Sequence, residues 1–103
     1  MSVTRPTFEE ICEAVAPIAA KHGIIRVYLF GSRARGDDRE GSDIDFFVVP
    51  PEGCGAMSLG SFLYDLEDAF GTDVDVIAEG SDYRPSFIEE VLRDRRLVFE
   101  ARV

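Results

Sequence analysis

The strongest constraint on the fold is the alternation of short apolar runs with longer amphipathic segments. Residues 25–30, 44–49 and 74–77 are almost continuously apolar, whereas residues 7–22 and 59–70 repeat apolar side chains at helical spacing. Apolar residues on both alternating sets suit a strand that is covered on both faces. The pattern predicts an α/β fold in which one small mixed β-sheet packs with α-helices.

Capping and stop residues mark the ends of the expected helices. Residues 7–10 (Thr-Phe-Glu-Glu) have the form of a capping box, and Gly23 is a C-terminal stop. Pro17 lies inside this helix and predicts a bend there. Pro85 opens a last helix, and residues 97–99 are expected to form a short terminal strand.

The length of 103 residues fits a single domain that spans residues 1–103. No apolar run approaches the ~20 residues of a membrane helix, and the N-terminus lacks the apolar core of a signal peptide. We therefore expect a cytoplasmic protein with no membrane partner. Cys12 and Cys54 belong to no C-x-x-C pair, which favours free thiols over a zinc site or a disulfide. The lone His22 is expected on the surface.

The charge balance restricts the class of partner. The chain has 20 acidic against 11 basic residues and a net charge of −9. Phosphate contacts to a long nucleic acid come from a basic face, so we expect no long nucleic acid as partner. A metal-chelated nucleoside triphosphate stays compatible with this charge, because the metal supplies the positive charge.

A glycine-rich turn follows the first predicted strand. Gly31 and Ser32 end the strand and begin a helical turn that Gly36 closes. Glycine allows close approach of the backbone to a ligand, and the amides that open such a turn can receive phosphate oxygens. The spacing of the two glycines fits a phosphate loop, but Asp37 and Asp38 replace the Lys and the Ser or Thr that this motif requires. We expect the acidic stretch over residues 37–41 to be a solvated loop.

Acidic residues lie on two of the predicted strands. Asp43 and Asp45 point to the same face because they are two residues apart, and they repel each other unless a cation or water intervenes. Asp75 stands between two valines, where burying a lone carboxylate is costly. If the two strands are neighbours, three carboxylates gather, and such oxygen ligands suit magnesium or manganese. Asp73 shares a face with Asp75 and is the alternative third ligand, although its place at the strand entrance favours solvation.

Together these motifs resemble a known family. Residues 31–36 (Gly-Ser-Arg-Ala-Arg-Gly) followed by residues 43–45 (Asp-Ile-Asp) resemble the signature of the DNA polymerase beta-like nucleotidyltransferases. Ten residues separate Ser32 from Asp43, a spacing similar to that of the minimal branch, the MNT proteins. The resemblance extends over nearly the whole chain and includes Asp75, and it implies the nucleotidyltransferase fold.

The resemblance implies roles for the acidic residues. Asp43 and Asp45 would bind the metal, and Asp75 would complete the site and help to activate the attacking hydroxyl. Mg²⁺, with Mn²⁺ as an alternative, would be the cofactor and ATP the co-substrate.

The resemblance also implies roles for the turn. Gly31 and Ser32 would hold the triphosphate. Of Arg33 and Arg35, one would touch phosphate while the other pairs with a carboxylate of the fold, and simple exposure of both is the competing interpretation.

Proteins similar to this one are commonly the antitoxins of HEPN/MNT toxin–antitoxin pairs. The resemblance therefore implies a hetero-oligomer with a HEPN-type toxin and transfer of AMP to a tyrosine of that toxin. Two alternatives stay open. One is an antitoxin that acts by occlusion alone, and the other is one subunit of an enzyme for small molecules, similar to the aminoglycoside nucleotidyltransferases. The sequence contains no motif that identifies the base of the nucleotide.

Overall fold

The computed structural model describes residues 6–36, 43–80 and 83–102, and the acidic loop expected at residues 37–41 lies outside these ranges. In chain order the elements are α1 (Phe8–Lys21), β1 (Arg26–Phe30), α2 (Ser32–Arg35), β2 (Ile44–Val49), α3 (Ala56–Phe70), β3 (Val74–Ala78), α4 (Pro85–Asp94) and β4 (Arg96–Glu100). The predicted elements are thus present, with boundaries that differ by a few residues at most.

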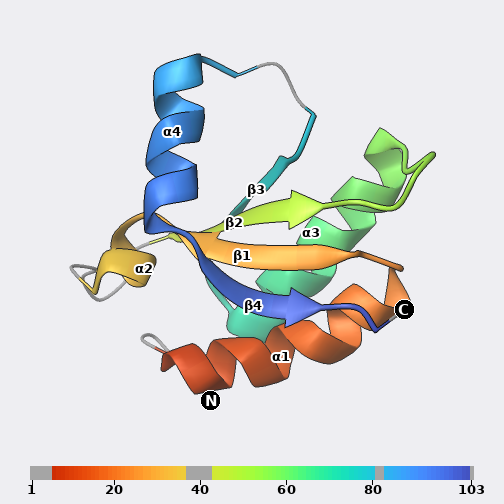
Figure 1. Cartoon of the computed structure of the whole chain (residues 1–103). Coiled ribbons are helices and arrows are strands. Elements are labelled where there is room, and N and C mark those ends of the chain that lie inside the picture. The colour runs from red at the N-terminus through yellow and green to blue at the C-terminus, as the bar shows by residue number, and fades with distance from the viewer. Residues whose placement is uncertain (1–5, 37–42, 81–82, 103) are drawn as a thin grey trace.

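The four strands form one mixed sheet in the order β3-β2-β1-β4 (Figure 1). β1 pairs antiparallel with β2 and with β4, whereas β2 and β3 are parallel. The sequence could not determine this order. The observed order places β3 directly beside β2, which is the condition that the expected gathering of carboxylates requires.

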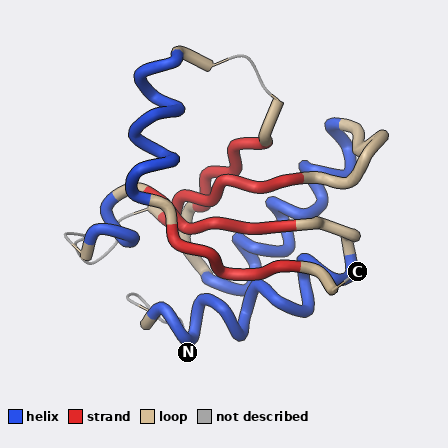
Figure 2. The backbone as a smooth tube through the Cα atoms, in the orientation of Figure 1, coloured by secondary structure: helices blue, strands red, loops and turns tan. Residues whose placement is uncertain are grey.

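The two faces of the sheet are covered differently. α1 and α3 lie together against one face, and α4 stands over the other face at one end of the strands (Figure 2). The larger core lies under α1 and α3 and includes Val15, Phe46 and Phe62, each fully buried. A smaller cluster around Phe47 and Val91 joins α4 to the opposite face. On that second face Tyr28 and Ile77 are only partly buried.

The ends of α1 follow the sequence signals. Thr7 accepts from the Glu10 amide at 3.1 Å and the Glu10 side chain accepts from the Thr7 amide at 2.9 Å, which is the predicted capping box. Gly23, just past the helix, has φ of 70°, a conformation that favours glycine. α1 continues through Pro17 without a break.

His22 corrects an expectation, because its side chain is only 11% exposed. Its Nε2 atom lies 2.7 Å from Asp65 Oδ2, and its ring meets Phe62 edge-on. The imidazole therefore joins the end of α1 to α3. This contact between distant segments gives no signal in the sequence. Within the described ranges, no helix has the length and apolar character that a membrane crossing demands.

Candidate active site

Asp45 and Asp75 face each other across the two parallel strands. They are register partners between β2 and β3, and their side chains interact with each other. Both alternate with residues of the α1/α3 core, so they lie on the sheet face that carries α4. Asp73 lies before β3, where its carbonyl accepts from the Ile44 amide at 3.2 Å. The structure thus places Asp75, rather than Asp73, opposite Asp45.

The environment of Asp45 disfavours its negative charge. Burial, the charge of Asp75, a hydrogen bond with the Asp75 side chain and the charge of Asp43 raise the pKa of Asp45 to about 6, and the Arg33 guanidinium opposes this shift. Two adjoining carboxylates with too little positive charge nearby form a donor set suited to a hard divalent cation. The chemistry of this pair therefore fits a metal site.

Asp43 occupies the entrance of β2 and is exposed. Its charge acts on Asp45, which shows that the two carboxylates are near each other. The described part of the chain nevertheless contains no group of three His, Cys, Asp or Glu side chains gathered as a metal site requires. The structure brings together Asp45 and Asp75, and the assignment of Asp43 as a third ligand stays a prediction.

Gly31 brings the backbone directly against this pair. It has φ of 75° and ψ of −155°, a region that is essentially restricted to glycine. A Cβ atom placed on Gly31 would lie 2.5 Å from Asp45 Oδ2. Both the backbone conformation and the space thus require glycine. Ser32 follows as the first residue of α2, so the start of this turn adjoins the carboxylates.

The two arginines of α2 have different environments. Arg33 is buried, and its Nε donates to the Asp43 carbonyl oxygen at 3.4 Å. Arg35 is exposed, and its Nη1 donates to Asp94 Oδ2 of α4 at 3.4 Å. Arg35 thus pairs with a carboxylate of the fold. Arg33 fixes the entrance of β2 and places positive charge near Asp45.

α4 contributes residues that the sequence did not single out. A cavity of about 130 Å³ beside the turn is lined by Phe30, Gly31, Arg35, Phe87, Glu90, Val91 and Asp94. Phe87, Glu90, Val91 and Asp94 recur at helical spacing along α4, but only the tertiary fold reveals that this side of the helix adjoins Gly31.

Comparison with known proteins gives consistent results. The profile of the family described as polymerase beta, nucleotidyltransferase matches residues 13–102. A protein of Methanocaldococcus jannaschii named "Putative protein adenylyltransferase MJ0435" is 40% identical over 88 residues, which are 85% of this chain and 88% of that protein.

Two solved structures share the fold. One, the structure of a putative minimal nucleotidyltransferase, is 35% identical with a TM-score of 0.76, and the match covers 91% of this chain and 98% of that chain. The other comes from a complex of a tri-AMPylated HEPN toxin of Shewanella oneidensis with an MNT antitoxin. It is 16% identical with a TM-score of 0.70 and covers 92% of this chain and 74% of its own, so it supports the fold alone.

Proposed function

Because the chain belongs to the polymerase beta nucleotidyltransferase family, we propose that it transfers AMP from ATP to a hydroxyl group of a partner protein. The observation that carries this proposal is the Asp45–Asp75 pair on neighbouring strands beside the backbone of Gly31. Carboxylates and a close-approaching backbone are the two elements that a metal-chelated triphosphate needs.

Asp45 and Asp75, with Asp43 from the entrance of β2, would hold Mg²⁺. When bound, Mg²⁺ would neutralise negative charge on the triphosphate and on the pyrophosphate that leaves. Mn²⁺ offers similar chemistry at oxygen ligands.

The chain's own residues would position the nucleotide and the acceptor. The amide and hydroxyl of Ser32, at the start of the Gly31 turn, would donate hydrogen bonds to phosphate oxygens. Asp75 lies on the open side of the pair, because it is exposed whereas Asp45 is half-buried. Asp75 would accept the proton of the attacking hydroxyl, whose oxygen forms a bond to the α-phosphorus as the bond to pyrophosphate breaks.

A tyrosine of a HEPN-type toxin is the acceptor that we propose. The name of the Methanocaldococcus relative supports a protein acceptor, and an AMPylated toxin occurs in the complex of the Shewanella relative. The working assembly would then be a hetero-oligomer.

The test is to incubate the chain with a purified HEPN toxin, Mg²⁺ and ATP labelled at the α-phosphate. We expect label on a toxin tyrosine, no label with Asp45→Asn, and normal labelling with Asp68→Asn, an exposed residue of α3 that changes the charge equally. Transfer would be refuted, and occlusion favoured, if an active toxin binds the chain and loses its activity but carries no label.

A further inference from the structure

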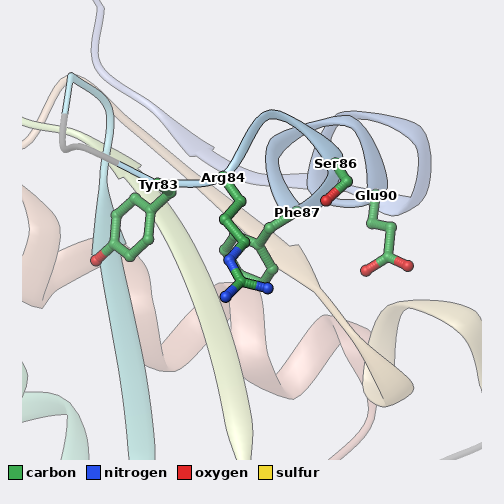
Figure 3. Close-up of a pocket in the computed structure, with 5 residues that line it drawn as sticks. All are labelled: Tyr83, Arg84, Ser86, Phe87 and Glu90. Atoms are coloured by element: carbon green, nitrogen blue, oxygen red, sulfur yellow. The ribbon is translucent and has the colours of Figure 1, made fainter.

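A second cavity opens at the beginning of α4, next to the candidate active site. It has a volume of about 460 Å³ and is lined by Tyr83, Arg84, Ser86, Phe87 and Glu90 (Figure 3). Tyr83 and Arg84 lie on the segment just before α4, and Ser86, Phe87 and Glu90 extend from the helix itself. The volume lies within the range of pockets that bind small molecules.

Aromatic side chains connect this cavity to the carboxylates. The rings of Tyr83 and Phe87 lie 5.7 Å apart, and the rings of Phe87 and Phe30 lie 6.0 Å apart in an edge-on contact. Phe30 is in turn the register partner of Asp45. The smaller cavity beside Gly31 also shares Phe87 and Glu90 with this one. The two cavities therefore adjoin along one side of α4.

The charges of the cavity wall point to a ligand rather than to a structural role. Arg84 is exposed, and no ion pair or hydrogen bond of its side chain is found within the described residues. This guanidinium lines the same cavity as two aromatic rings, in a chain of net charge −9. Aromatic rings and arginine together form the kind of surface on which nucleobases stack.

We propose that this cavity binds the base of the nucleoside triphosphate. The inference rests on the proposed transfer function, which places the phosphates at the Gly31 turn. A nucleotide anchored there has its base several bonds away, and the route along Phe87 leads to the second cavity. Tyr83 supplies the exposed stacking face, since it is 41% exposed, and Arg84 covers the ligand. Ser86 and Glu90 supply oxygen acceptors for an amino group of the base.

The test compares two ligands that differ in the base. The binding of a non-hydrolysable ATP analogue and of inorganic tripolyphosphate, each with Mg²⁺, is measured by calorimetry. We expect Tyr83→Ala to lower the affinity for the ATP analogue by about tenfold, because one stacking partner is lost, and to leave the affinity for tripolyphosphate unchanged. Phe87→Leu keeps an apolar contact with Phe30 and should act in the same direction. Tyr64→Ala, at a 70% exposed position of α3, is the control.

A direct signal is available because the chain contains no tryptophan. Tyr83→Trp introduces a single reporter whose fluorescence should be quenched by the ATP analogue and not by tripolyphosphate. The proposal would be overturned if Tyr83→Ala and Phe87→Leu bind the analogue with unchanged affinity, or if they lose affinity equally for the analogue and for tripolyphosphate. Slower transfer to the toxin with intact analogue binding would also overturn it and assign the cavity to the acceptor. A wild-type chain that does not bind the analogue would instead remove the proposed function itself.

Discussion

Neutralising Asp45 should stabilise the metal-free protein while it abolishes transfer. The folded chain holds Asp45 beside Asp75 in a half-buried position, and this raises the pKa of Asp45 to about 6 from the usual 3.8. At neutral pH the ionised carboxylate therefore destabilises the folded state. Asp45→Asn removes this charge, and its amide can donate a hydrogen bond to Asp75.

The size of the effect follows from linkage between protonation and folding. The difference between about 6 and 3.8 corresponds to an upper limit of about 3 kcal/mol at neutral pH. Solvent screening at a position that is only half-buried reduces the expected gain to about 1–2 kcal/mol. The carboxyl's contribution is most favourable below the unfolded pKa and is lost as the pH rises through about 6. The gain in the free energy of unfolding of Asp45→Asn over the wild type should thus be large at pH 7.5 and small near pH 4.

The assay is urea unfolding with EDTA at both pH values, using the wild-type chain, Asp45→Asn and Asp68→Asn. Asp68 is exposed on α3, so its replacement should change the free energy of unfolding by no more than about 0.5 kcal/mol. A variant Asp45→Asn that is no more stable than the wild type at pH 7.5, or equally stabilised at both pH values, would refute this account of the pair.

Three further perturbations test separate contacts. Gly31→Ala should lower the free energy of unfolding in urea by at least about 2 kcal/mol, because it combines backbone strain with a clash against Asp45. Gly36→Ala, with φ of 81° and open space around the added methyl group, should lower it by about 1 kcal/mol. Equal losses of stability would contradict the close approach of Gly31 to Asp45. Asp65→Asn should destabilise the protein more at pH 7 than at acidic pH in thermal unfolding, because His22 and Lys21 lower the pKa of Asp65. Stability from a lowered carboxyl pKa is lost as the pH falls through the folded value. A destabilisation that does not change with pH would contradict this role of Asp65. Asp94→Asn should accelerate amide hydrogen exchange in α2 with a loss of less than about 1 kcal/mol in global stability, because it weakens the ion pair between Asp94 and Arg35. Unchanged exchange would show that this ion pair does not hold the turn.

Much of the fold could be predicted because its signals are local. The capping box at Thr7, the stop at Gly23 and the apolar runs depend on neighbours in sequence, and the structure has all of them. Alternation along a strand also placed Asp45 and Asp75 correctly once β2 and β3 were neighbours.

The remainder depends on contacts between distant segments. The strand order, the ion pair of Arg35 with Asp94 and the burial of His22 against α3 arise only when the chain is folded. For the same reason the sequence did not indicate that Phe87 lines the cavity beside Gly31. Close packing of elements, rather than local pattern, determines these features.

The central claim is that Asp45 and Asp75 jointly bind a divalent cation together with the nucleotide. Electron paramagnetic resonance of Mn²⁺, titrated with chain and a non-hydrolysable ATP analogue, measures this binding directly. We predict saturable binding by the wild-type chain and by Asp68→Asn, and loss of at least tenfold in affinity with either Asp45→Asn or Asp75→Asn. Equal Mn²⁺ affinity in all four proteins would contradict the claim.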